Sequence, residues 1–152
     1  MILTHILQPA CVKVPLSGTD KNSVIKELIE LLDANKLLIN KDEVLQSVVN
    51  REATRSTGIG SGIAIPHGKC KGVKELVIAV GISRQGIDFQ SIDEKPVYIV
   101  VLLASPIDKT GPHIQALARI SRLMLDESFR GKLQNSTSAK ELYDLIISKE
   151  TE

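Results

Sequence analysis

Hydrophobic side chains recur at helical spacing in several stretches of the chain. Between Asn22 and Ala34 the apolar positions alternate with charged ones as on an amphipathic helix, and they are Val24, Ile25, Leu28, Ile29, Leu31 and Leu32. A similar stripe follows Asn40, which with Glu43 resembles a capping box, and it consists of Val44, Leu45, Val48 and Val49. The sequence therefore predicts a helix over 22–34 and a second helix that begins after Asn40 and ends between residues 51 and 54.

Two further helices are predicted toward the end of the chain. Gly111-Pro112 precedes apolar residues at helical spacing, and proline suits the first helical position because its missing N–H is not needed there. His113 then lies in the first turn of this helix. A last helix is expected from Ser138, where Glu141 completes another capping-box pattern ahead of a stripe formed by Leu142, Leu145 and Ile146.

Three segments have the composition of β-strands. Residues 76–82 and 97–104 are short, rich in Val and Ile and nearly uncharged, as strands covered on both faces are. Residues 10–16 alternate apolar and polar positions up to Pro15, which suits an edge strand. Because helices and strands mix without a linker or an internal repeat, we expect a single α/β domain over residues 1–152, with a central mixed β-sheet flanked by α-helices.

The composition narrows the classes of function. Hydrophobic residues make up 43% of the 152 positions, enough for a core, while nineteen basic and eighteen acidic residues leave a net charge of +1. This charge gives no long-range attraction to nucleic acid, and an aromatic content of 3% without Trp leaves few rings for stacking on bases or sugars. Neither nucleic acid nor a directly bound sugar is expected as a partner.

The sequence also bears on location and metal chemistry. It has neither a leader-like N-terminus nor eighteen consecutive apolar residues, so we expect a cytoplasmic chain without direct membrane insertion. Cys11 and Cys70 stand far apart without metal-binding spacing, which favours two reduced thiols over a disulfide or a zinc site. His5 is interpreted as structural, and three scattered histidines predict no metal site.

The most unusual segment is rich in glycine and leads to a histidine: Ser56-Thr57-Gly58-Ile59-Gly60-Ser61-Gly62-Ile63-Ala64-Ile65-Pro66-His67-Gly68-Lys69. Alternating glycines allow close approach of the backbone to another group, and the sequence predicts an apolar strand that stops at Pro66-His67-Gly68 and presents an exposed His67. The glycine spacing differs from a dinucleotide fingerprint, and Cys70 stands where a Walker motif needs Ser or Thr. We therefore expect no nucleotide or other cofactor.

Together with Arg51-Glu52, this segment resembles the signature of the fructose/mannitol-type enzyme IIA domains of the bacterial phosphotransferase system. The resemblance extends to the later strands, to Pro112-His113, to residues 118–123 and to the closing helix, so it covers nearly the whole chain. It implies an α/β fold with a mixed sheet and a phosphotransferase with a phosphohistidine intermediate. In that family the histidine at the position of His67 is phosphorylated by the carrier protein HPr and passes the group to a cysteine of enzyme IIB.

The chemistry of phosphoryl transfer and the resemblance point to further site residues. A neutral imidazole is a good nucleophile toward phosphorus at pH 7, and transfer requires in-line placement with cations or N–H donors around the phosphoryl oxygens. Arg51 can meet two oxygens at once, and the matching arginine lies at the family's active site. His113 matches the family's second active-site histidine and is expected to stabilise the phosphoryl group. Glu52 is expected to orient Arg51, and Thr57 to add a hydroxyl.

Two functions are compatible with these residues. The first is a phosphoryl carrier for fructose-class sugar uptake, which accepts phosphate from phospho-HPr and serves a separate or membrane-linked enzyme IIB. The alternative is a nitrogen-type regulatory enzyme IIA, whose phosphorylation state controls binding to other proteins. A mannitol-type assignment is disfavoured because Ile-Pro precedes His67 and Lys69 follows Gly68. A module that has lost the chemistry is disfavoured because all three site residues are present.

A basic rim follows the histidine, formed by Lys69, Lys71 and Lys74. Two interpretations of this rim are open. It either faces an acidic partner or only solvates a loop.

Overall fold

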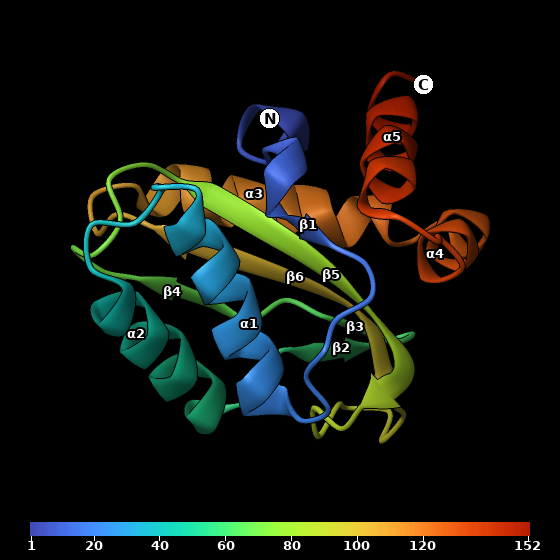
Figure 1. Ribbon diagram of the computed structural model, residues 1–152, viewed down its shortest axis with the longest axis horizontal. Helices are drawn as coiled ribbons and strands as arrows, with labels where there is room; N and C mark the ends of the chain where they lie inside the picture. The colour runs from blue at the N-terminus through green and yellow to red at the C-terminus, as the bar shows by residue number, and fades with distance from the viewer.

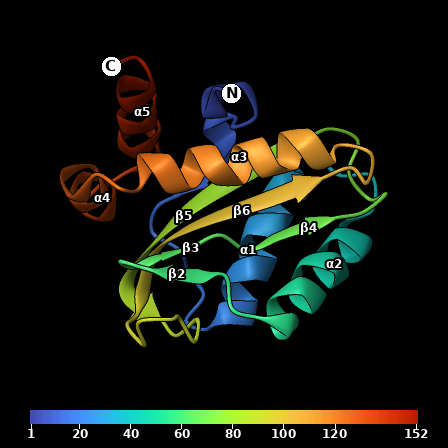
Figure 2. The same cartoon turned by 180° about the vertical axis from the view of Figure 1, so that it is seen from behind.

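A six-stranded mixed β-sheet forms the centre of the computed structural model, which describes residues 1–152. Helices cover both faces of the sheet, with α1 (Lys21–Ala34) and α2 (Lys41–Thr54) on one face and α3 (Thr110–Leu123) on the other (Figures 1 and 2). The remaining helices, α4 (Glu127–Gln134) and α5 (Ala139–Glu150), lie beyond one end of α3. The predicted α/β class and mixed sheet are therefore confirmed.

The two longest strands, β5 (Val77–Ile87) and β6 (Val97–Ser105), pair antiparallel in the middle of the sheet. The short strand β1 (Val12–Lys13) runs parallel to β5 at one edge, as the proline of the predicted edge strand indicated. β5 continues five residues beyond the predicted end. The prediction stopped too early because the last part of β5 is largely exposed and does not share the uncharged pattern of the buried part. Two short 3₁₀ turns, η1 (Leu3–His5) and η2 (Pro9–Cys11), precede β1.

The glycine-rich segment forms three short strands along the other side of the sheet. β2 (Gly58–Gly60) pairs antiparallel with β3 (Ile63–Ala64), and both β3 and β4 (His67–Lys69) pair parallel with β6. β3 and β4 keep the same register on β6, so they are two parts of one line, interrupted where Pro66 has no N–H to donate. The prediction that the strand stops at Pro-His-Gly is wrong, because pairing resumes at His67.

The predicted first two helices are confirmed, with small differences at their ends. The Asp20 side chain caps α1 by accepting a hydrogen bond from the Ser23 backbone N–H, so this helix begins one residue earlier than predicted. Asn40 caps α2 through the backbone N–H of Glu43, as expected. The Glu43 carboxylate instead accepts from the Lys71 backbone N–H, so the capping box is only half formed.

The last three helices show where the local pattern was less informative. α3 begins at Thr110, which places Pro112 at the third helical position instead of the first; the N–H is unused there too. α4 was not predicted because it is only eight residues long. α5 begins after Ser138, whose hydroxyl accepts from the Glu141 backbone N–H, as expected. None of the helices combines the length and apolar composition that a membrane crossing requires.

The hydrophobic core lies between the sheet and its helices. It is one connected cluster to which the buried faces of α1, α2 and α3 and both central strands contribute. β5 and β6 are buried over most of their length, which explains their nearly uncharged sequences. This core holds β6 in place, and β4 pairs with the side of β6 that faces away from β5. The core thereby determines the position of His67.

Candidate active site

His67 is the first residue of β4, and its ring is held by the main chain two residues before it. Nδ1 lies 2.7 Å from the Ile65 carbonyl oxygen. A carbonyl oxygen can only accept, so Nδ1 carries the ring proton and donates it, while Nε2 keeps the free lone pair. The ring is half-buried, in place of the exposed ring expected from the sequence. The ring nitrogen that the fold leaves unprotonated is therefore Nε2.

The surroundings of His67 favour its neutral form. Burial lowers the pKa of the ring, the hydrogen bond to the Ile65 carbonyl opposes this effect, and the positive charge of Arg51 lowers the pKa further. The smaller effects of Glu52 and Lys69 oppose one another. Because the net shift is downward, the imidazole is neutral and nucleophilic at neutral pH.

His113 lies beside His67, with ring centroids 5.3 Å apart and an angle of 63° between the ring planes. Its Nδ1 is 2.5 Å from Oγ of Ser105, the last residue of β6, and both side chains are buried. The Ser105 hydroxyl has no other acceptor among the hydrogen bonds of the structure, so it donates to Nδ1 of His113. Nε2 of His113 consequently bears the proton and is a hydrogen-bond donor.

The pKa of His113 falls to about 4, first because of burial and then because of the positive charges of His67 and Lys69. His113 is therefore a neutral donor at physiological pH. Lys69 lies next to the start of α3, with its Nζ 3.4 Å from the Thr110 hydroxyl. All three lysines of the predicted basic rim are exposed. Only the charge of Lys69 lowers the pKa of both His67 and His113, whereas Lys71 and Lys74 lie in the loop that follows.

Arg51 shares a surface cavity with His67. The cavity has a volume of about 270 Å³ and lies between the end of α2, the loop before β2 and α3, with Arg51, Arg55, Thr57, Ile65, His67 and Leu117 among its lining residues. Arg51 donates from Nη1 to the Arg55 carbonyl oxygen at 2.9 Å, which holds the guanidinium near the end of the helix. The structure thus brings Arg51, His67 and His113 together.

Two smaller expectations are wrong. Glu52 does not contact Arg51: its buried carboxylate accepts hydrogen bonds from Thr57 and forms an ion pair with Lys21. The Thr57 hydroxyl donates to Glu52 at 2.5 Å, so its proton is not available to a ligand in the cavity. Glu52 faces the interior because position 52 continues the buried side of α2, on which the adjacent Arg51 does not lie.

Of the three alternating glycines, Gly58 allows the close approach that the sequence indicated, whereas Gly60 and Gly62 serve a turn instead. A Cβ at Gly58 would overlap with Oγ of Ser91, and one at Gly68 would lie 2.6 Å from Oγ of Ser47 on α2. Gly60 and Gly62 have positive φ angles and form the turn between β2 and β3. Gly68 therefore lets β4 pack directly on α2, which brings His67 close to Arg51.

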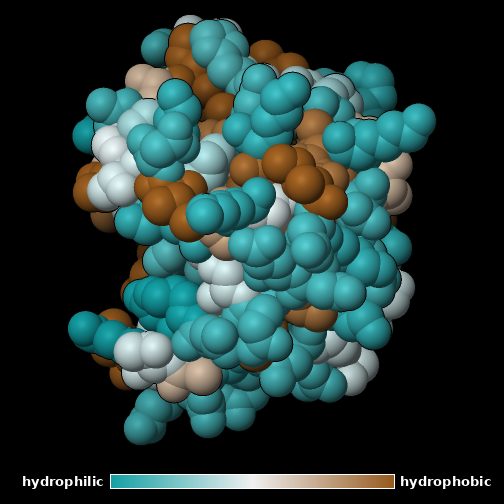
Figure 3. Space-filling view, turned by 90° about the vertical axis from the view of Figure 1, so that its left-hand side faces the viewer, coloured by the Kyte–Doolittle hydropathy of each residue, from teal (hydrophilic) through white to brown (hydrophobic).

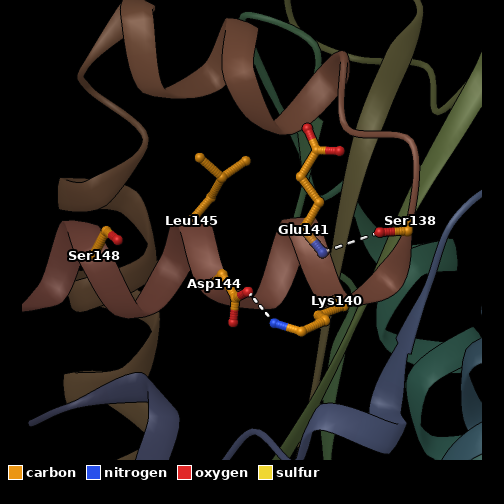
Figure 4. A pocket seen from close by; sticks show the side chains of 6 residues that line it. All are labelled: Ser138, Lys140, Glu141, Asp144, Leu145 and Ser148. Atoms are coloured by element: carbon orange, nitrogen blue, oxygen red, sulfur yellow. Dashed lines mark hydrogen bonds and ion pairs between the residues drawn. The ribbon is translucent and has the colours of Figure 1, made fainter.

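Other parts of the surface do not resemble this site. The hollow along α5 in Figure 4 is lined by one helix and its cap, and its Lys140 is already bound to Asp144. The side of the molecule shown in Figure 3 is mainly hydrophilic, with hydrophobic side chains in separate patches. No group of three or more His, Cys, Asp or Glu residues could hold a metal ion, and both cysteines are buried free thiols whose pKa is raised by burial.

Chemically, the arrangement suits the transfer of an anionic group to and from a histidine. The fold and the comparison with known families agree on this class. The family described as "Phosphoenolpyruvate-dependent sugar phosphotransferase system, EIIA 2" matches residues 5–149. The chain therefore belongs to this family of phosphoryl carriers, as the sequence resemblance predicted.

Relatives of two kinds are equally similar. The chain is 34% identical to the "PTS system fructose-specific EIIABC component" of Bacillus subtilis (strain 168), over 96% of this chain but only 23% of that protein. It is 33% identical to a "Nitrogen regulatory protein" of Klebsiella oxytoca, over 95% of this chain and 89% of the relative. Among solved structures, the Nitrogen Regulatory Protein IIA-Ntr from Neisseria meningitidis superposes with a TM-score of 0.86 at 29% identity, covering 93% of this chain and 97% of that one.

Proposed function

We propose that residues 1–152 act as a single phosphoryl-carrier domain in the cytoplasm, which accepts a phosphoryl group on Nε2 of His67 from phospho-HPr and passes it to a cysteine of enzyme IIB. The observation that carries this proposal is the hydrogen bond from Nδ1 of His67 to the Ile65 carbonyl. It leaves Nε2 as the nucleophile in a site that also contains Arg51 and His113.

The two transfers balance without a cofactor. The Nε2 lone pair attacks phosphorus, and the N–P bond of the donor histidine breaks with its electron pair returning to the donor ring. The His67 ring then carries a formal positive charge, which the Ile65 carbonyl stabilises through the Nδ1 proton. In the second transfer a thiolate attacks phosphorus, the N–P electron pair returns to Nε2, and His67 leaves as a neutral imidazole.

The neighbouring groups complement the charge of the phosphoryl oxygens. Arg51 supplies a guanidinium that can meet two oxygens, and Lys69 adds a second positive charge close to both histidines. His113 provides a neutral Nε2–H donor whose tautomer is held by Ser105. Because these groups are already in place beside His67, they stabilise the transition state without a large rearrangement.

Two physiological uses of this site are proposed, and one observation supports each. The Bacillus subtilis relative is named a fructose-specific EIIABC component, which supports a role in fructose-class sugar uptake with a membrane-linked enzyme IIB. The nitrogen regulatory relatives match this chain over most of their own length, which supports a regulatory protein whose phosphorylation state controls binding. Both uses need the same phosphorylation of His67.

The test is phosphorylation of the wild-type chain and of His67→Ala with phosphoenolpyruvate, enzyme I and HPr. Intact mass and phosphorus NMR should show one acid-labile phosphoryl group on the wild type and none on His67→Ala. His5→Ala is the matched control, because His5 is exposed on η1 and should leave labelling unchanged.

Addition of candidate enzyme IIB proteins then separates the two uses. Loss of the label to a cysteine of enzyme IIB supports transport, whereas retention of the label together with phosphorylation-dependent binding to another protein supports regulation. An unlabelled wild-type chain in the presence of active donors would contradict the carrier function altogether.

A further inference from the structure

A buried carboxylate lies behind the active site, where the pattern of α2 calls for an apolar residue. Val44 and Val48 are buried at four-residue spacing, and Glu52 is the next position on the same side of the helix. Its side chain is only 2% exposed. A buried carboxylate is costly unless it is paired, and an apolar residue at such a position is often neutral or stabilising. Stability alone therefore gives no reason for Glu52.

The Glu52 carboxylate is fully engaged by two residues from other parts of the chain, Lys21 and Thr57. Its Oε1 is 3.3 Å from Nζ of Lys21, in the first turn of α1. Its two oxygens accept from the Thr57 backbone N–H at 3.1 and 3.2 Å, and Oε2 accepts from the Thr57 hydroxyl at 2.5 Å. Thr57 is thereby fixed at both its main chain and its side chain.

The contacts of Thr57 continue to the active-site ring. The Thr57 carbonyl accepts a hydrogen bond of 3.1 Å from the Ile65 backbone N–H. The carbonyl of Ile65 accepts from Nδ1 of His67 at 2.7 Å. An unbroken series of polar contacts therefore runs from Lys21 through Glu52, Thr57 and Ile65 to the nitrogen that determines the tautomer of His67.

We propose that Glu52, together with Lys21 and Thr57, is a positioning group for His67. By fixing Thr57, it holds the Ile65 peptide so that the Ile65 carbonyl faces Nδ1 and Nε2 stays unprotonated. Glu52 does not touch the reacting atoms. The inference rests on the proposed function of His67 as the phosphoryl acceptor, and it adds the residues that keep the acceptor nitrogen available.

We call this series of contacts from Lys21 through Glu52, Thr57 and Ile65 to His67 the relay. Substitution of Glu52 or Thr57, in the middle of the relay, should change the tautomer of His67. Glu52→Gln weakens the anchor of Thr57, and Thr57→Val removes the hydroxyl with little change in shape. At pH 8, where the ring is neutral, long-range ¹H–¹⁵N NMR of ¹⁵N-histidine-labelled protein should show His67 mainly protonated on Nδ1 in the wild type. Both variants should show an increased fraction protonated on Nε2.

The rate of phosphorylation by HPr should change in parallel. We expect Glu52→Gln to lower the rate about tenfold, because the acceptor nitrogen is no longer held in line, while the final extent of labelling is unchanged. Thr57→Ser retains the hydroxyl, so its His67 tautomer and its phosphorylation rate should be closer to wild type than those of Thr57→Val. Glu43→Gln is the matched control: it makes the same change on the same helix, at an exposed carboxylate whose one hydrogen bond is to the Lys71 backbone N–H.

Folded Glu52→Gln and Thr57→Val proteins with the wild-type tautomer and rate would overturn the relay. If Glu52→Gln does not fold, the comparison of Thr57→Val with Thr57→Ser decides the question by itself. The tautomer is measured without any phosphoryl donor. A shifted tautomer in variants of a chain that HPr does not label would therefore support the relay while contradicting the carrier function.

Discussion

At the scale of single residues, the two histidines of the site are prepared in opposite ways. His67 donates from Nδ1 to a carbonyl, which can only accept, whereas His113 accepts on Nδ1 from the Ser105 hydroxyl. One ring thus presents a lone pair on Nε2 and the other presents a proton on Nε2. In the proposed function, the pair provides a nucleophile and a neutral donor from the same type of side chain.

The lowered pKa of His113 predicts how stability depends on pH. The unfolded chain titrates this histidine near pH 6.5, and the folded chain near pH 4. Between these values the unfolded state binds more protons, so the free energy of unfolding falls as the pH falls, by about 2 kcal/mol between pH 7.5 and pH 4.5 from this group. Below pH 4 the contribution of His113 is constant.

Urea unfolding at pH 7.5 and pH 4.5 measures this dependence. Wild type should lose more stability between the two pH values than His113→Gln does, by about 2 kcal/mol. His5→Gln serves as the control and should behave like wild type, because His5 is exposed. Equal losses in wild type and His113→Gln would show that His113 is not held neutral by the fold.

At the scale of elements, the site depends on direct packing of α2 against β4. α2 carries Arg51 and Glu52, and β4 begins with His67. The distance between α2 and β4 therefore determines how close Arg51 and Glu52 lie to His67. Gly68 makes this packing possible. A Cβ there would lie 3.1 Å from both Cγ2 and the backbone nitrogen of Val48, in addition to the shorter approach to Ser47.

Gly68→Ala should therefore destabilise the fold and the site together. We expect a loss of about 1–3 kcal/mol in the free energy of unfolding, because the added methyl group overpacks a helix–strand contact in which backbone must move. The phosphorylation rate should fall as well, since β4 and His67 move with Gly68. Both quantities are accessible from urea unfolding and from labelling by HPr.

Gly131→Ala is the matched control for this substitution. Gly131 lies inside α4, where an added Cβ meets nothing within 4 Å. Alanine favours the helix there, so stability should rise by about 0.5–1 kcal/mol with an unchanged phosphorylation rate. A Gly68→Ala protein as stable and active as wild type would contradict the importance of the close contact.

At the scale of the whole molecule, α5 joins the two ends of the chain. The N-terminal turn η1 and α5 lie at the same end of the sheet (Figure 1). The Glu150 carboxylate accepts from the backbone N–H groups of Leu3 at 2.6 Å and Thr4 at 3.0 Å, and it lies 3.4 Å from Nε of Arg119 on α3. This carboxylate, 2% exposed, thus connects three elements that are distant in sequence.

Glu150→Gln should cost about 2 kcal/mol or more of unfolding free energy, because one amide oxygen cannot satisfy both backbone donors and the ion pair with Arg119 is lost. Glu30→Gln is the control. Its pair with Lys26 is exposed and 3.9 Å long, so its loss should change stability by less than about 0.5 kcal/mol. Urea unfolding of the two variants tests the difference, and similar small effects would argue against a structural role of Glu150.

The sequence by itself determined the α/β class, the first two helices and the central strands. These follow from periodicity and composition within short windows, which local structure obeys when a helix or strand buries one face. The glycine-rich segment also singles out His67, since its residue pattern is long and specific. Arg51 and His113 came from family resemblance, and the structure brings both close to His67.

Only the tertiary structure decided which hydrogen bonds the side chains of the site make. Ser105 was missed because nothing in its own strand distinguishes it from a residue that merely ends β6, and Glu52 was assigned to the neighbouring Arg51 instead of to Lys21 and Thr57. Which nitrogen of His67 is protonated depends on the Ile65 carbonyl, which lies in the interruption between β3 and β4. Hydrogen bonds of this kind join residues far apart in sequence or depend on backbone geometry, so no local pattern contains them.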